Sequence, residues 1–152
     1  SAPARIVNVA SVGHKLWRRA AFDPRAEQGY GEMSAYAQSK LANILFTREL
    51  ARRMTGTGVV VNCLHPGGVN TNIWFANQSI GAKLVGWLSA PFMVSPEQGA
   101  DTMIWLASAP EAGEFTGEYF YKRKRRRTSD LGADMALAGQ LWTLSEGLVR
   151  PA

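Results

Sequence analysis

The segment SAYAQSKLAN, residues 34–43, places a tyrosine and a lysine four positions apart. Residues at this spacing lie on the same face of an α-helix, so Tyr36 and Lys40 would be neighbours on a helix. A phenol has a pKa of about 10, and an ammonium group beside it favours the ionised form. The pair is therefore suited to proton exchange at a reacting oxygen. Taken alone, the same spacing also fits an ordinary solvated helix face.

Three apolar runs are predicted to form the strands that position this pair. RIVNVAS (5–11) and VVVNCL (59–64) are rich in β-branched residues, which predicts strands buried on both faces. GEYFY (117–121) predicts a third strand. Residues 12–32 mix glycine, proline and charged residues and are predicted to form a loop.

Helices are predicted between and after these strands. A helical period begins at Ser34, the expected N-cap, and its apolar face includes Leu41 and Ile44. Ser95, followed by Pro96 and Gln98, predicts a second helix start with a capping box. A last helical pattern covers residues 134–149.

Alternating strands and helices predict an α/β fold with a parallel sheet covered by helices. Ligands of such sheets bind at the carboxyl ends of the strands. Ser11 follows the first strand and HPGGVNT (65–71) follows the second, while Tyr36 and Lys40 open the helix between them. We therefore expect these three features to meet at one edge of the sheet.

The composition limits the kind of protein. The chain has 152 residues, 46% hydrophobic and 19% charged, which predicts one globular domain with a core of its own. Its single cysteine, Cys63, fits a reducing compartment, and neither HExxH nor CxxC occurs, so we expect no metal site. We find no run of about 20 apolar residues and no secretory signal, and we expect a cytoplasmic protein.

The net charge of +5 is concentrated in KRKRRR, residues 122–127. Such a run could bind nucleic acid, an anionic membrane surface or an import receptor. Because no aromatic residues alternate with the cations, we favour a solvated loop after a strand over a nucleic-acid platform.

Together, the strand-end Ser11, the Y-x-x-x-K of residues 36–40 and the P-G-x-V-x-T of residues 66–71 resemble the short-chain dehydrogenase/reductase superfamily. The retinol-dehydrogenase-like branch is the most similar, and the resemblance extends from about Arg5 to Val149. It implies a Rossmann-like, doubly wound parallel sheet with flanking helices, of which this chain would be the C-terminal half.

The resemblance also implies a function and a set of site residues. The function is hydride transfer between NAD or NADP and a lipophilic alcohol or carbonyl substrate, with the choice of cofactor left open. Tyr36 would exchange the substrate proton, Ser11 would hydrogen-bond the substrate oxygen, and Lys40 would hold the nicotinamide ribose. The residues implied are, for catalysis, Ser11, Tyr36 and Lys40; for the cofactor, Tyr36, Lys40, Pro66, Gly67, Val69 and Thr71; for the substrate, Ser11, Trp74 and Trp87.

No glycine-rich turn follows a strand in this sequence, since GTG (56–58) precedes one and GYG (29–31) lies in the predicted loop. We therefore expect residues 1–152 to form one domain segment, the catalytic half of a dinucleotide-binding dehydrogenase without its glycine-rich half. As an isolated segment it is expected to be inactive.

Two other functions stay open: a non-catalytic remnant that acts through association, and a basic module that binds nucleic acid or an anionic surface. For the enzyme we expect a small lipophilic substrate and no nucleic acid, and we leave peripheral membrane contact and homo-oligomer formation open. Asn8, His14 and His65 are interpreted as structural residues.

Overall fold

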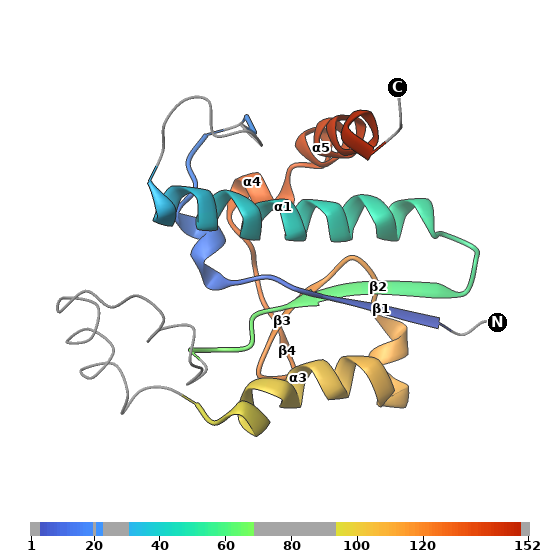
Figure 1. The fold of residues 1–152 in the computed structure, drawn as a ribbon. Coiled ribbons are helices and arrows are strands. Elements are labelled where there is room, and N and C mark those ends of the chain that lie inside the picture. Colours follow the sequence, from blue (N-terminus) through green and yellow to red (C-terminus); the bar gives the residue numbers. More distant parts are fainter. Residues whose placement is uncertain (1–3, 20, 23–30, 69–93, 150–152) are drawn as a thin grey trace, which may run out of the picture.

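A four-stranded sheet forms the centre of the fold in the computed structural model, which describes residues 4–19, 21–22, 31–68 and 94–149 (Figure 1). The strands, in their spatial order, are β1 (Ala4–Val9), β2 (Val59–Leu64), β3 (Tyr119–Tyr121) and β4 (Lys124–Arg125). β1, β2 and β3 are parallel, and β4 is antiparallel to β3. The predicted α/β class and Rossmann-like parallel sheet are confirmed.

Helices cover both faces of the sheet, as the doubly wound arrangement requires (Figure 1). α1 (Glu32–Arg53) lies along one face with α5 (Met135–Val149) packed against it, and α3 (Pro96–Ser108) lies on the other face. The described residues also form three short helices: η1 (Val12–Leu16), η4 (Pro110–Glu114) and α4 (Asp130–Ala133). α1 begins at the edge where β1 and β2 end (Figure 1).

Apolar side chains fix these layers. Ile44 of α1 packs with Cys63 and Tyr119 against one sheet face, while Leu106 of α3 packs with Phe120 against the other. α1 and α5 share a further cluster of buried residues, which includes Leu41 and Leu45 of α1 and Leu137, Ala138 and Leu141 of α5. The predicted apolar face of the first helix is thereby confirmed.

The start of the first helix differs from the prediction. α1 begins at Glu32 with Gly31 as N-cap, so Ser34 is not the cap. The Ser34 N–H donates to the Gly31 carbonyl at 2.9 Å, which places Ser34 inside the first turn. Gly31 and Glu32 are themselves a favourable cap and first residue, since an acidic side chain suits a helix N-terminus. The capping box of Ser95 and Gln98 at the start of α3 is confirmed.

Two further predictions need correction. β1 is only half-buried, because it is an edge strand of the described sheet and lacks a neighbour on one side. The basic run is not all loop: Lys122 and Arg123, with φ of 50° and 56°, form the turn of the β3–β4 hairpin. Positive φ at both turn residues gives the twist that two-residue hairpins prefer. The side chains of residues 122–127 are exposed, as expected for a solvated segment.

Among the described helices, none combines the length and apolar character needed to cross a bilayer. Within the same residues, no group of three or more histidine, cysteine, aspartate or glutamate side chains is arranged to hold a metal ion.

Candidate functional site

Ser11 lies just past the carboxyl end of β1 and caps η1. Its side chain is buried, at 6% exposure, and its Oγ accepts a hydrogen bond from the Gly13 N–H at 3.1 Å. A hydroxyl that accepts in this way keeps its own proton free to donate to another oxygen. The Asn43 side chain of α1 donates to the Val9 carbonyl at 2.9 Å and so ties the helix to the end of the same strand.

Tyr36 and Lys40 lie one turn apart on α1, as their spacing predicted. The Lys40 Nζ is 5.5 Å from the centroid of the Tyr36 ring, within cation–π distance. Tyr36 is 43% exposed, so solvent and ligands can reach its ring. Neither its hydroxyl nor the Lys40 ammonium has a hydrogen-bond partner among the described residues. Both polar groups are therefore available to a ligand.

Gly13 brings the serine and the tyrosine together, and the sequence interpretation did not include it. A Cβ at Gly13 would lie 2.8 Å from Cε1 of Tyr36 and 3.4 Å from Oγ of Ser11. The first distance is a steric clash, so only glycine allows the Tyr36 ring to approach the turn that carries Ser11. The only signal in the sequence was a glycine two residues after the strand-end serine.

His14 connects the serine turn to a distant segment. It is fully buried, its Nδ1 lies 2.6 Å from the Ser11 carbonyl oxygen, and its Nε2 accepts from the Ser129 N–H at 3.1 Å. Because Nε2 accepts, the ring proton sits on Nδ1 and is donated to Ser11. Burial lowers the pKa of His14, against the raising effect of the Ser11 hydrogen bond, which favours this neutral form. The predicted structural role is confirmed.

Asn8 is likewise structural: its side chain donates to Thr47 Oγ1 at 2.9 Å and links β1 to α1. His65, which directly follows β2, was also interpreted as a structural residue. It packs against Tyr121 with ring centroids 5.1 Å apart, but its buried Nδ1 has no hydrogen-bond partner among the described residues. Within the described residues, His65 thus contributes packing without a hydrogen bond at Nδ1.

Pro66 and Gly67 follow at the carboxyl end of β2, beside the end of β1 that leads to Ser11. Gly67 has φ of +95°, which favours glycine, and a Cβ at Gly68 would meet no described residue within 4 Å. The turn thus presents bare backbone at the same edge as Ser11. The other predicted cofactor and substrate residues, Val69, Thr71, Trp74 and Trp87, lie outside the described residues.

A cavity of about 570 Å³ opens between η1 and the ends of β2 and β3. Val12, His65, Tyr119 and Tyr121 form its walls, and Val12 is the residue that follows Ser11. This volume is in the range of small-molecule sites, and apolar and aromatic walls are typical of them. The structure therefore places an open cavity against η1, on which Val12 and Lys15 line it and which Ser11 caps; Ser11 and Tyr36 are not among its lining residues.

Comparisons with known proteins agree with this geometry. A family model described as short chain dehydrogenase matches residues 2–79. Human retinol dehydrogenase 14 is 43% identical over 151 residues, and human retinol dehydrogenase 12 is 39% identical over 145 residues. These alignments cover 98% and 95% of this chain but 45% of each relative, so the chain spans less than half the length of the curated relatives it matches.

Among solved structures, the chain is similar to an uncharacterised protein from Mycobacterium paratuberculosis, with a TM-score of 0.66 and 27% sequence identity. The similarity covers 95% of this chain and 50% of that protein.

Proposed function

Because this chain belongs to the short chain dehydrogenase family, we propose that the protein containing it transfers a hydride between NAD or NADP and a lipophilic alcohol or carbonyl compound. The observation that carries the proposal is the meeting of Ser11 and Tyr36 across Gly13, with Lys40 one turn from the tyrosine. A solvated helix face would not require a glycine against the tyrosine ring.

Tyr36 exchanges the proton of the substrate oxygen in this proposal. Its hydroxyl is unpartnered among the described residues and its ring is partly exposed, so a substrate oxygen can reach it. When an alcohol is oxidised, the deprotonated Tyr36 oxygen takes the hydroxyl proton and becomes a neutral phenol; when a carbonyl is reduced, the neutral phenol gives its proton to the substrate oxygen and is left deprotonated. Lys40 places a positive charge 5.5 Å from the centroid of the Tyr36 ring and keeps its own donors free for a sugar hydroxyl.

Ser11 orients the reacting oxygen. The Ser11 Oγ already accepts a hydrogen bond from the Gly13 N–H. Its own O–H is therefore free to donate to a ligand oxygen. The Nδ1 of His14 lies 2.6 Å from the Ser11 carbonyl oxygen, and this hydrogen bond fixes the turn. A preorganised donor of this kind stabilises the charge that develops on the substrate oxygen.

The residues present fit the nicotinamide end of the cofactor. At the carboxyl end of β2, Gly68 leaves open space among the described residues, where a flat ring can approach the backbone without meeting a Cβ. Lys40 and Tyr36 supply donors for the ribose, and Val69 and Thr71 are proposed to complete the contact. When bound, the nicotinamide accepts or supplies the hydride.

The names of the similar relatives support a lipophilic substrate, since two of them are retinol dehydrogenases. The side chains of Val12, Tyr119 and Tyr121 in the cavity next to η1 agree with this choice. Trp74 and Trp87 are proposed to add apolar surface to the same site.

The test uses the protein that contains this chain, with NAD+ or NADP+ and a series of primary alcohols of increasing chain length. We expect turnover whose kcat/KM rises with length, by up to about 0.8 kcal/mol for each methylene buried. Ser11→Ala should lower kcat/KM by about 100-fold, as loss of a preorganised donor does. No cofactor binding and no turnover would instead favour the non-catalytic alternative.

A further inference from the structure

The cavity beside Ser11 has an unbalanced charge. Besides its apolar and aromatic walls, it is lined by Lys15, Arg126 and Arg127, and by no carboxylate among the described residues. None of these three cations has an ion-pair partner in the described part of the chain. By contrast, Arg123 and Arg125 of the same basic run are paired with Asp101 and Glu118.

The backbone holds the two arginines at this cavity. The Arg126 N–H donates to the Tyr119 carbonyl at 2.8 Å, which attaches the segment to β3. Three residues later, the Ser129 N–H donates to His14, the histidine that also binds the Ser11 carbonyl. The backbone of Arg126 and Arg127 is therefore held by two hydrogen bonds, one to β3 and one to His14, which also binds the Ser11 carbonyl. Lys15 approaches from η1, four residues after Ser11.

The walls of the cavity do not supply the missing negative charge. Burial raises the pKa of Tyr119 and lowers that of His65, so both side chains are neutral near pH 7. A purely apolar ligand would contact the aromatic and aliphatic side chains of the cavity. It would leave Lys15, Arg126 and Arg127 without a counter-charge. A ligand with an apolar body and an anionic end would satisfy both parts.

We propose that this cavity selects amphipathic substrates, with the alcohol or carbonyl directed to Ser11 and Tyr36 and an anionic end held by Lys15, Arg126 and Arg127. The inference rests on the proposed function and narrows its substrate class. Carboxylates and phosphate monoesters share the required chemistry, and the experiment separates them.

The experiment compares an ω-hydroxy fatty acid with its methyl ester in the protein that contains this chain. The ester keeps the length and the reacting hydroxyl but lacks the charge. We expect kcat/KM for the acid to exceed that for the ester by about tenfold at low salt, mainly through KM, as a charge-assisted contact provides. A third substrate, the phosphate monoester of the matching diol, shows which anion is preferred.

The variant Arg126→Gln/Arg127→Gln should reduce the preference for the acid to about twofold or less and leave turnover of the ester unchanged within about twofold. Lys124→Gln is the matched control, because Lys124 belongs to the same basic run and does not line this cavity. It should leave the preference for the acid intact.

Equal kcat/KM for acid and ester, or a preference that survives the double variant, would overturn the inference while leaving the proposed function in place. If no alcohol is turned over, the proposed function fails, and calorimetry still decides the inference. The ω-hydroxy acid should bind the wild-type protein more tightly than the ester, and the double variant should lose that difference. Equal binding of acid and ester would overturn the proposal.

Discussion

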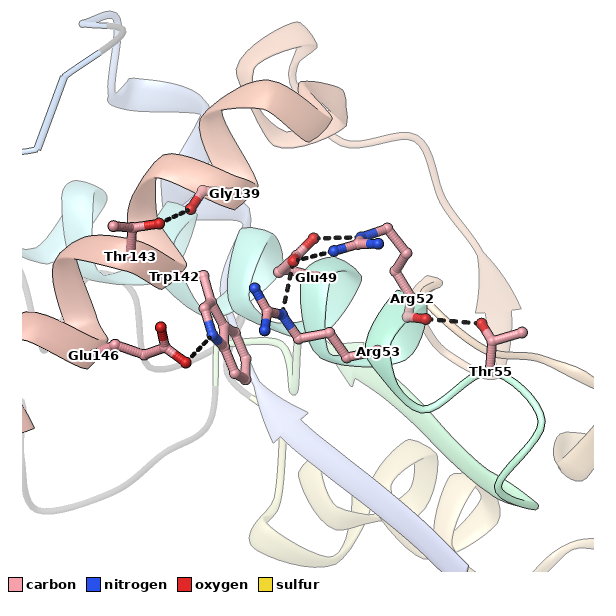
Figure 2. Close-up of polar contacts among 8 residues, drawn as sticks. All are labelled: Glu49, Arg52, Arg53, Thr55, Gly139, Trp142, Thr143 and Glu146. Carbon is pink, nitrogen blue, oxygen red and sulfur yellow. Dashed lines mark hydrogen bonds and ion pairs between the residues drawn. The ribbon is translucent and has the colours of Figure 1, made fainter.

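α1 carries a cation over an aromatic ring near each of its ends, and the two pairs differ in their surroundings. Near the start of the helix, Lys40 lies 5.5 Å from the centre of the Tyr36 ring. At the other end, the Arg53 guanidinium lies 4.2 Å from the centre of the Trp142 ring of α5 (Figure 2). The same type of contact thus occurs twice on one helix.

In the pair at the end of α1, both polar groups are hydrogen-bonded to other residues of the protein. Glu49, only 2% exposed, accepts from Arg53 at 2.8 Å and from two nitrogens of Arg52 at 2.7 and 2.9 Å (Figure 2). Trp142 stacks on Phe46, with ring centroids 5.4 Å apart, and donates to Glu146. These contacts attach this end of α1 to α5.

The pair at the start of α1 is open. The Tyr36 hydroxyl and the Lys40 ammonium have no hydrogen-bond partner among the described residues, and the tyrosine borders the serine turn across Gly13. An aromatic–cation pair whose polar groups are bonded within the protein stabilises the fold, whereas one whose polar groups are free can serve a ligand. The predictions below test this difference between the two ends of α1.

Tyr36→Phe should have the largest effect on activity. The substitution removes the exchangeable proton and little else, so turnover should fall at least about 100-fold while the cofactor dissociation constant changes less than about twofold. Both are measured on the protein that contains this chain. Trp142→Phe, which removes the polar group of the other ring, should leave turnover within about twofold. Retention of more than about a tenth of the rate in Tyr36→Phe would refute the assignment.

Lys40→Ala should affect both binding and rate. Loss of the ammonium removes donors proposed for the ribose and the positive charge beside the Tyr36 ring, so the cofactor dissociation constant should rise and turnover should fall, each by about tenfold. Arg53→Gln at the far end of α1 is the control, and it should change neither value. If both variants behave alike, the distinction between the two ends is wrong.

Gly13→Ala should act through the position of Tyr36. The added methyl would lie 2.8 Å from the ring, so the ring must move away from Ser11, and turnover should fall by about tenfold with the free energy of unfolding nearly unchanged. Gly139→Ala is the control, because a Cβ there meets no atom within 4 Å in the part of the chain that the structure describes. It should not lower turnover, and it is expected to stabilise α5 by up to about 1 kcal/mol. A Gly13→Ala protein with normal turnover would show that the close approach has no catalytic role.

Much of this organisation could be predicted from the sequence, because it depends on local pattern. Apolar periodicity and capping residues predicted β2, the start of α3 and the apolar face of α1 closely. The meeting of Tyr36 and Ser11 at one edge followed from the topology of parallel strands. Val69 and Thr71 remain predictions, since they lie outside the described residues.

The features that the sequence did not predict depend on contacts between distant residues. The role of Gly13 depends on a ring 23 positions later in the chain, and His14 receives its second hydrogen bond from Ser129, at a separation of 115 residues. The β4 strand forms because Lys122 and Arg123 adopt positive φ, which few non-glycine residues do. Neither the identity of a distant neighbour nor such a turn can be inferred from a local pattern.

Glu49→Gln should have the smallest effect on activity, because the carboxylate belongs to the structural end of α1. Turnover per folded molecule should stay within about twofold, while the free energy of unfolding at pH 7, measured with urea, should fall by about 1–2 kcal/mol. Glu118→Gln is the control: its ion pair with Arg125 is exposed on the arginine side, and its loss should cost less than about 0.5 kcal/mol.

The pH dependence of this difference identifies its origin. Hydrogen bonds from Arg52, and then Arg53, lower the pKa of Glu49 from 4.5 to about 2 in the folded protein. A lowered pKa means that the carboxylate stabilises the fold fully above about pH 4.5 and loses this contribution as the pH falls towards 2. Glutamine does not titrate, so the gap between wild type and Glu49→Gln should narrow between pH 5 and pH 3. A gap that stays constant over this range would mean that Glu49 stabilises the contact between α1 and α5 by packing and not by its charge.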